Sequence, residues 1–475
     1  MTELELRIPL GVGEALRDIV FRSGRHEYVA MGLTSHARLG DRDTLFLRYL
    51  LELPESAYRS NAGHGAVWSG SAMIPAITRA IEETLGIVIF HAHGHGGPPQ
   101  LSDDDRRSAE RLIPMFRARV PARPHGSVVL SRSHAGGIVL MPGESASRTD
   151  LAVRWLGASI MDWRISLLDR SGRAPGENFA RQLAVVRDDG QRALGHARVA
   201  VVGLGGGGSH VVQQLAHLGV GEIIGIDADR VARTNRPRLI GMTRLDLWLR
   251  RKKTMIMRRM VRRVGLSSRC RTIEERVPGP AAVEALKTVD VIVGCLDNLH
   301  ARADLQELSS RFLIPYIDVG VNIRAIKDPE PDGPRVTIGG NILTLIPGGF
   351  CMWCSGFLSR EKLHSELKGP NRNYFENRDG EAQVVSLNGV VASQAVTEVL
   401  QLLTGFGGSG LRRRDVELDG QSGLQRGFRK LNGVRGTLDD WGAARRSDCS
   451  FCSSMVGAGA VSWCGPVEKT QPIFG

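Results

Sequence analysis

The feature that most constrains this chain is a glycine-rich turn between a short apolar run and a helical pattern. The run ARVAVVG (197–203) has the length of a buried strand, and the turn GLGGGGS (203–209) follows it directly. A helical pattern and a second apolar run come next, and two further short apolar runs lie at 289–298 and 314–322. Strands that alternate with helices predict an α/β fold, with a mainly parallel, Rossmann-like sheet covered by helices on both faces.

The turn is also a candidate phosphate site. Gly203, Gly205, Gly206 and Gly208 would let the backbone approach a phosphate, and the start of a helix offers free N–H groups and the positive end of a dipole. Asp227 ends the next apolar run, where a carboxylate can bind a ribose hydroxyl. At this point a tight turn without a ligand and the nucleotide site of a dehydrogenase are both alternatives.

The residues after Asp227 favour a different nucleotide enzyme. The stretch DADRVARTNRPR (227–238) resembles the second signature of the ThiF/MoeB family, whose relatives include the ubiquitin-activating enzymes. The family pattern has an Asp at the strand end, a second Asp two residues on, Ser/Thr-Asn, and an Arg three residues later. The positions that fill it here are Asp227, Asp229, Thr234, Asn235 and Arg238.

Three more residues follow from the same resemblance. The family's lysine matches Lys253, with Lys252 as the close alternative, and its magnesium-linked aspartate matches Asp297 in GCLDN. Its arginine finger, which reaches into the partner subunit, matches Arg181 in FARQL. The resemblance spans residues 177–453. A dehydrogenase would leave Asn235 and Arg238 unexplained.

What the resemblance implies is ATP-dependent adenylation of the C-terminal glycine of a ubiquitin-like protein, with Mg²⁺, by a homodimer. The residue types suit that chemistry, because the attacking carboxylate and ATP are both anions. Arg181, Arg238 and Lys253 can neutralise the phosphates, and Asp297 can hold the magnesium ion.

Two C-x-x-C pairs stand far apart in this half, at Cys351/Cys354 and Cys449/Cys452. Four thiolates in two such pairs suit a tetrahedral, structural Zn²⁺, and many members of the resembled family carry them. The ubiquitin activators have a thioester cysteine in the region after the first pair, but residues 355–383 contain none. Cys464 is the remaining candidate for a thioester.

The N-terminal part carries a second candidate metal site. His91 and His93 follow the apolar run GIVIF (86–90), and Ser102 and Asp105 come after them. This order resembles the JAMM (JAB/MPN) metalloprotease motif. The resemblance implies a catalytic Zn²⁺ held by His91, His93 and Asp105, with Glu27 as general base. The alternatives are the pair His93/His95, or a histidine-rich loop before a helix whose acidic first turn favours the helix dipole.

We therefore expect an N-terminal α+β JAMM-type domain (1–150), a linker (151–176), a Rossmann-like adenylation domain with a structural zinc site (177–453), and a tail (454–475). The expected partners are a ubiquitin-like protein ending in glycine and a conjugating enzyme. Activation of a sulfur carrier and a non-catalytic binding module are the alternative functions.

Composition limits the class of protein. The 475 residues are 42% apolar and 24% charged, as in soluble globular proteins. The net charge of +12 suits an acidic partner, without indicating nucleic acid. No basic segment precedes an apolar core at the N-terminus, and no window of 18 apolar residues occurs. We expect a soluble protein of a reducing cytoplasm, with no membrane span.

Overall fold

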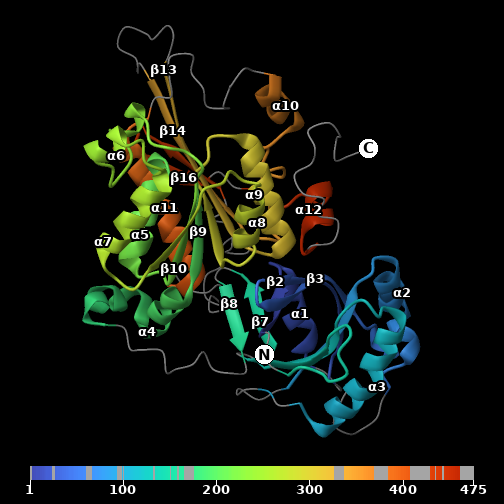
Figure 1. Cartoon of the computed structure of the whole chain (residues 1–475). Helices are drawn as coiled ribbons and strands as arrows, with labels where there is room; N and C mark the ends of the chain where they lie inside the picture. The colour runs from blue at the N-terminus through green and yellow to red at the C-terminus, as the bar shows by residue number, and fades with distance from the viewer. Residues whose placement is uncertain are drawn as a thin grey trace. The chain divides into compact units, whose positions relative to one another are not determined.

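A computed structural model gives the architecture of the chain, which divides into two compact units (Figure 1). The first contains Met1–Gly172 with Arg311–Leu313 and Ser454–Trp463, and the second contains the remainder. The residues that the structure describes are 3–23, 27–59, 67–93, 99, 101–131, 134–149, 151–157, 160–164, 176–325, 336–368, 383–406, 428–433, 435–440 and 443–459.

The first unit is built on one mixed sheet with the strand order β6-β5-β4-β2-β3-β1-β7-β8. Parallel pairs (β1 with β3 and β7, β4 with β5) stand beside antiparallel ones such as β2 with β3 and β4. The strands are β1 (Glu3–Ile8), β2 (Ala30–Leu39), β3 (Arg42–Glu52), β4 (Gly86–Ala92), β5 (His125–Leu130), β6 (Ala135–Leu140), β7 (Leu151–Leu156) and β8 (Ile160–Arg164).

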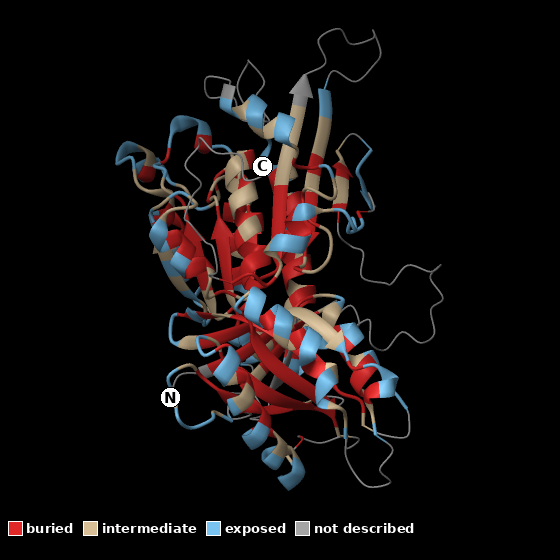
Figure 2. Cartoon of the chain, turned by 90° about the vertical axis from the view of Figure 1, so that its right-hand side faces the viewer, coloured by how far each residue is buried: buried red, intermediate tan, exposed pale blue. Residues whose placement is uncertain are grey.

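Helices cover both faces of this sheet, and the alternation of side chains along the strands explains how. On one face, Val88 and Phe90 of β4 pack in a core with α1 (Val12–Val20). On the other face, Ile87 and Ile89 pack in a core with α2 (Ile74–Glu82) and α3 (Asp103–Arg119). Since successive strand residues point to opposite faces, an uninterrupted apolar strand contributes side chains to two hydrophobic cores, one on each face of the sheet. Figure 2 shows the strands buried and the outer helix faces exposed.

The structure corrects two boundaries of the predicted first domain. The linker expected over 151–176 begins with strands β7 and β8, which extend the first sheet. Its mixed sequence concealed a strand because Leu151 and Val153 face the core while Arg154 joins a buried charge cluster with Glu5. The first domain, expected to end at residue 150, therefore extends at least to Arg164.

The second unit has a sheet with the order β11-β10-β9-β12-β13-β14-β15-β16. Strands β9 to β13 are parallel to one another, and β14 to β16 continue the sheet antiparallel. The strands are β9 (Arg198–Val202), β10 (Glu222–Ile226), β11 (Arg269–Ile273), β12 (Val291–Gly294), β13 (Tyr316–Ala325), β14 (Val336–Leu345), β15 (Phe428–Asn432) and β16 (Thr437–Asp440).

Helices lie on both faces of this sheet as well, with α5, α7 and α11 on one side and α8 and α9 on the other (Figure 1). The α/β, Rossmann-like expectation for this unit is therefore confirmed. The helices are α4 (Ala180–His196), α5 (Gly206–Leu218), α6 (Arg244–Trp248), α7 (Lys253–Val264), α8 (Pro280–Leu286), α9 (Leu299–Phe312), α10 (Arg360–Lys368), α11 (Val385–Thr404) and α12 (Ser450–Met455). Because α12 spans residue 454, the expected loose tail does not begin there; residues 460–475 lie outside the described part.

The order of the strands creates a crevice at one place. From β9 the chain moves outward through β10 and β11, then returns to the other side of β9 with β12. In parallel sheets, ligands bind at the carboxyl ends of the strands where the chain reverses direction in this way. The glycine turn after β9, Asp227 after β10 and Asp297 after β12 all lie at this edge.

Two glycines bring α5 close to β9. Gly203 has a φ of +87°, and a Cβ atom there would lie 2.5 Å from the carbonyl oxygen of Cys295. A Cβ atom at Gly208 would lie 1.9 Å from the carbonyl oxygen of Gly203. By contrast, a Cβ atom at Gly207 would meet nothing within 4 Å. The glycine turn therefore contains positions that packing requires to be glycine and others, such as Gly207, where a side chain would meet no neighbour.

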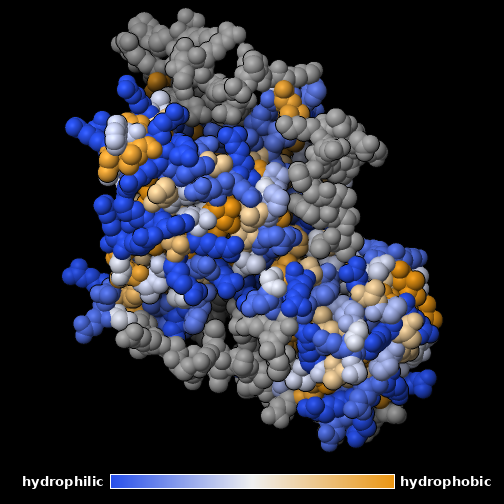
Figure 3. Space-filling view, in the orientation of Figure 1, coloured by the Kyte–Doolittle hydropathy of each residue, from blue (hydrophilic) through white to orange (hydrophobic). Residues whose placement is uncertain are grey.

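The positive charge of the chain is concentrated on one edge of the second unit. Residues 228–276, from the end of β10 through α6, α7 and β11, hold sixteen Arg and Lys against four Asp and Glu, which equals the net charge of the whole chain. Figure 3 shows hydrophilic side chains over α7 and an apolar group over α6, where Leu245 and Trp248 are exposed. Within the described residues, no helix is long and apolar enough to span a bilayer.

We predict that Gly208→Ala lowers the free energy of unfolding by about 2 kcal/mol, because its methyl group overlaps backbone that cannot move aside. The matched change Gly207→Ala should leave stability within about 1 kcal/mol of wild type, since its methyl group enters open space in a helix. Urea unfolding of the two variants measures the difference. Equal losses would contradict the close approach of α5 to β9.

Candidate functional site

A cavity of about 380 Å³ opens at the switch point of the second sheet. It gathers residues from the ends of several strands and from the starts of α7 and α11. The predicted site residues that line it are Gly203, Gly205, Gly206, Asp227, Asn235, Arg238, Lys253 and Asp297. Gly208 and Arg181 are not among the lining residues: Gly208 is packed against the backbone of Gly203, and Arg181 is exposed near the start of α4.

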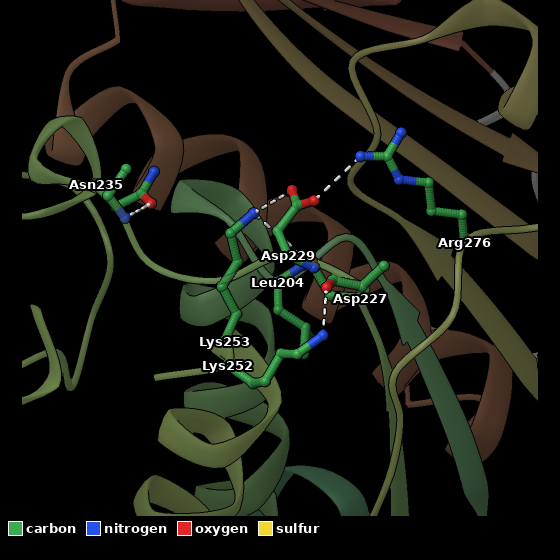
Figure 4. A network of polar contacts seen from close by, with 9 residues as sticks. Leu204, Asp227, Asp229, Asn235, Lys252, Lys253 and Arg276 are labelled. Carbon is green, nitrogen blue, oxygen red and sulfur yellow. Dashed lines mark hydrogen bonds and ion pairs between the residues drawn. The ribbon is translucent and has the colours of Figure 1, made fainter. Parts of the chain in front are cut away.

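The carboxylate of Asp227 organises the charged side of the cavity (Figure 4). Its oxygens accept hydrogen bonds from the backbone N–H of Leu204 and of Asp229, both at 2.8 Å. The Nζ atom of Lys253 lies 3.4 Å from Asp227 and 2.9 Å from Asp229. Burial acts to raise the pKa of Asp229, but its hydrogen bond and ion pair with Lys253 outweigh this and lower that pKa. The carboxylate of Asp229 therefore stays ionised beside Lys253.

The two candidate lysines differ in position. Lys253 begins α7 and lines the cavity, while the Nζ atom of Lys252 donates to the carbonyl oxygen of Ala228 at 2.9 Å and lies 3.9 Å from Glu274. Lys252 is not a lining residue. The structure thus brings Lys253, rather than its neighbour, to the aspartates.

The signature asparagine shapes the loop after β10. The side chain of Asn235 is buried, and its Oδ1 accepts a hydrogen bond from the backbone N–H of Ala232 at 2.9 Å. The backbone N–H of Arg238 donates to the carbonyl oxygen of Asn235, and the half-buried Arg238 side chain lines the cavity. Thr234 is exposed and is not a lining residue, so the cavity uses the asparagine and arginine of the signature.

The helix that follows the glycine turn opens toward this cavity. Helix α5 begins at Gly206, and no side chain caps its N-terminus. Cβ atoms at Gly205 and Gly207 would meet nothing within 4 Å, so the backbone there is accessible. Free N–H groups and the positive end of a 13-residue helix dipole are suited to an anion such as a phosphate.

Asp297 stands between β12 and α9, exposed in the cavity. The backbone of the preceding residue, Leu296, is fixed by a buried arginine. Nε of the buried Arg302 donates to the carbonyl oxygen of Leu296 at 3.1 Å, and Arg302 is itself paired with the buried Asp318. The hydroxyl of Tyr316 donates to the other oxygen of Asp318 at 2.6 Å. A fixed backbone therefore presents a solvent-accessible carboxylate.

Several lining residues were not predicted from the sequence. Arg276, after β11, lies 3.3 Å from Asp229 and adds a third cation to the charged side. Asn322 on β13 and Asn388 on α11 line the opposite side. Only strand pairing and helix packing bring these three residues to the cavity, so no local motif could have identified them.

The four predicted cysteines of the two C-x-x-C pairs meet in the second unit. Their Sγ atoms all lie within 4.8 Å of one another. The separations are 3.6 Å for Cys351 and Cys354, 3.8 Å for Cys351 and Cys449, and 3.7 Å for Cys354 and Cys452. A tetrahedron with Zn–S bonds of about 2.3 Å has S···S edges of about 3.8 Å, so the cluster has the size of such a site.

The remaining cysteines show no such arrangement. Burial raises the pKa of the Cys295 thiol to about 12 and that of Cys270 to about 11, which makes both poor nucleophiles. Cys464, the candidate for a thioester, lies outside the described residues.

In the first unit, the end of β4 brings His91, His93 and Asp105 together. The Nε2 atom of His91 lies 3.0 Å from Oδ1 of Asp105, and that of His93 lies 3.3 Å from Oδ2. His91 Nε2 is buried and makes no hydrogen bond of normal geometry. The three ligand atoms lie within 4.8 Å of one another, and two histidines with one carboxylate are a donor set that suits a three-residue zinc site. His95 lies outside the described residues.

The other motif residues occupy the same end of the sheet. Ser102 and Asp105 form a capping box at the start of α3, in which Ser102 also donates to Asp105 Oδ2 at 2.7 Å. Asp105 therefore caps the helix and faces the histidines at once. Glu27, half-buried, precedes β2, which runs antiparallel to β4 with Ala30 opposite Phe90. The chain at Glu27 thus lies toward the end of β4 that carries the histidines.

Comparison with known proteins gives relatives of the second unit. Over 182 residues the chain is 27% identical to the sulfur carrier protein ThiS adenylyltransferase of Escherichia coli K12, covering 37% of this chain and 66% of the relative. Over 180 residues it is 30% identical to the SAMP-activating enzyme E1 of Haloferax volcanii, covering 38% and 61%. The match thus spans less than two thirds of either relative's length.

Among solved structures, Escherichia coli MccB aligns with 58% of this chain and 75% of its own, at 19% identity and a TM-score of 0.44. The ThiF family matches residues 179–445, which include the glycine turn, the signature after β10, Asp297 and the first cysteine pair. On this match, which covers more than half of its length, the chain belongs to the ThiF family.

Proposed function

We propose that the second unit activates the C-terminal glycine of a ubiquitin-like protein by adenylation with ATP and Mg²⁺. The observation that carries this proposal is one cavity, beside an uncapped helix start, that collects Asp227, Arg238, Lys253 and Asp297 from separate segments of the chain. The relatives add support, since one is an adenylyltransferase of a sulfur carrier protein and another an E1 enzyme.

The chemistry follows from the charges. The terminal carboxylate of the partner attacks the α-phosphorus of ATP, an acyl–phosphate bond forms, and the bond to pyrophosphate breaks. Arg238 and Lys253 would neutralise the approaching anions, and the start of α5 would bind phosphate oxygens. Asp227 would bind the ribose. Asp297, whose carboxylate is exposed in the cavity, would hold Mg²⁺, and the ion would offset charge on the leaving pyrophosphate.

Arg181 is a proposal of a different kind. It is exposed and does not line the cavity of its own chain. A role as an arginine finger therefore requires a second copy, in which Arg181 of one subunit would reach the ATP of the other. A homodimer is part of this proposal.

Two alternatives have support of their own. The ThiS adenylyltransferase favours a sulfur carrier as the partner, and the SAMP-activating enzyme favours a protein tag. Residues 355–448, between the two C-x-x-C pairs, contain no cysteine for a thioester. A non-catalytic binding module would bind the partner without exchange of pyrophosphate. The identity of the partner, and of any conjugating enzyme, separates these functions.

For the four-cysteine cluster we propose a structural Zn²⁺. The sulfur separations fit a tetrahedral ion with no open position. The ion would join the loop at Cys351 and Cys354 to the start of α12, nearly one hundred residues further along the chain.

For the first unit we propose a JAMM-type zinc peptidase that processes or deconjugates the same partner. The observation that favours it is the meeting of His91, His93 and Asp105 at the end of β4, with a buried histidine nitrogen that lacks a normal hydrogen bond. The ion would lower the pKa of a bound water molecule. Glu27 would take up the proton of that water. Such an enzyme would free the terminal glycine that the second unit activates.

We predict that Lys253→Ala lowers ATP–pyrophosphate exchange at least about 100-fold, because it removes a half-buried cation from the phosphate side together with its ion pairs to Asp227 and Asp229. Lys252→Ala should stay within a few-fold of wild type, since its amine is bonded outside the cavity. The assay uses labelled pyrophosphate with the partner protein present. Similar rates for the two variants would contradict the proposed site.

We predict that metal analysis finds one tightly bound Zn²⁺ in the second unit, and that Cys449→Ser removes it and lowers the melting temperature, because binding of structural zinc contributes to folding. Cys270→Ser is the matched control, since Cys270 is not part of the cluster. A zinc-free Cys449→Ser protein with the stability of wild type would rule out this role.

For the first unit, Glu27→Gln should reduce cleavage of a C-terminally extended partner by about 10²–10⁴-fold and leave its zinc content unchanged, because a general base does not ligate the metal. His91→Ala should lose both metal and cleavage. Zinc content and cleavage are measured on the same samples. If His95→Ala loses the metal and His91→Ala keeps it, the choice of histidines is wrong; if wild type binds no zinc at this site, the peptidase proposal fails.

A further inference from the structure

The cavity of the second unit has two chemically different sides. The cations Arg238, Lys253 and Arg276 come from the segments after β10 and β11. The side formed by β13 and α11 carries apolar and amide side chains instead; its members are Val319, Val321, Asn322, Ile323, Gln383, Asn388, Val391 and Ala392. A triphosphate is suited to the first side. The second side is suited to a neutral, extended chain.

Asn388 is the clearest sign of a missing ligand on the neutral side. Its side chain is only 4% exposed, and its Nδ2 donor has no hydrogen-bond partner. A Cβ atom at Gly206 would lie 2.4 Å from that nitrogen, so the amide stands directly beside the start of α5. A buried donor without a partner costs free energy, and a group that can complete its hydrogen bond, such as a bound ligand, removes that cost.

Asn322 offers the complementary group. It lies on β13 opposite Gly339 of β14, and its Oδ1 acceptor is buried without a hydrogen-bond partner. The neutral side therefore presents one unused donor and one unused acceptor to the same cavity. A peptide unit needs both, since it carries one carbonyl oxygen and one N–H group.

We infer that Asn322 and Asn388 form a subsite for the last peptide units of the substrate, adjacent to the carboxylate that is adenylated. Nδ2 of Asn388 donates to a peptide carbonyl oxygen, and Oδ1 of Asn322 accepts from a peptide N–H. This inference rests on the proposed adenylation, and it names the residues that recognise the backbone of the tail. Val319 and Val391 also line the cavity and give this side an apolar surface.

The cation nearest to this side does not turn it into a phosphate site. Arg302 lines the cavity, but its guanidinium is engaged with the carboxylate of Asp318 and the carbonyl oxygen of Leu296. Amides without a free cation bind a neutral backbone better than a triphosphate, whose charge needs compensation.

The test uses the full chain saturated with Mg²⁺ and the analogue AMPCPP, whose α–β methylene bridge prevents release of pyrophosphate, and a hexapeptide ending in Gly-Gly with a free carboxylate as the probe. Asn388→Leu should raise the Kd of the peptide about tenfold, the effect of about 1.4 kcal/mol. The Kd of AMPCPP should change less than about twofold. The melting temperature should stay equal or rise, because leucine removes an unpaired buried donor.

A modified peptide tests Asn322 separately. Methylation of the last peptide nitrogen should weaken binding to wild type about tenfold, and should have little further effect on Asn322→Val, which has already lost the acceptor. Ser393→Ala, on the same helix but exposed and outside the cavity, should behave as wild type.

Two results would overturn the inference. One is weaker AMPCPP binding by Asn388→Leu with unchanged peptide binding, which would assign the amide to the nucleotide. The other is a melting temperature well below wild type in Asn388→Leu with peptide affinity unaltered, which would make the residue structural. Failure of the proposed function is seen separately, as absence of pyrophosphate exchange by wild type with its partner.

Discussion

The second unit depends on the carboxylate of Asp227, which ties the glycine turn to the next strand. It accepts hydrogen bonds from Leu204 within the turn and from Asp229 beyond its own strand. The turn is thereby fixed with its helix N-terminus free, and the loop toward Asn235 starts from a fixed point. Lys253 balances the charge that this carboxylate and Asp229 place there. One buried acid thus sets the backbone and the cation pattern of the cavity together.

Much of this arrangement was predictable from the sequence because it is local. The glycines, Asp227 and Asp297 each follow a strand directly, and carboxyl ends of parallel strands share one edge. Sequence reasoning could not identify Arg276, Asn322 and Asn388, which reach the cavity through strand order and helix packing. It also assigned 151–176 to a linker, because a strand with a buried arginine, such as Arg154 paired with Glu5, does not have the pattern of an apolar run.

The two candidate metal clusters also show what local sequence patterns can and cannot predict. Cys351 and Cys449 are nearly one hundred residues apart, yet the C-x-x-C spacing was sufficient to associate them, because two such pairs together suit one tetrahedral ion. For the histidines the sequence left two pairs open, because His91 and His93 share a strand end but the loop before Ser102 has no fixed length. In the structure, His91 and His93 lie close to Asp105. The helix cap formed by Ser102 holds Asp105 facing the histidines.

The cavity also differs in how far its two sides are complete. On the charged side, Asp227, Asp229 and Lys253 already satisfy one another, so a nucleotide would enter a site whose geometry exists in advance. On the neutral side, Asn322 and Asn388 keep buried polar atoms without partners. The free energy of that side would fall when the peptide groups of a bound chain complete these hydrogen bonds. A substrate that completes these bonds is held beside Asp297 and the start of α5, where the phosphates would lie. The unfavourable state of the empty site therefore favours binding of the tail where its carboxylate can react.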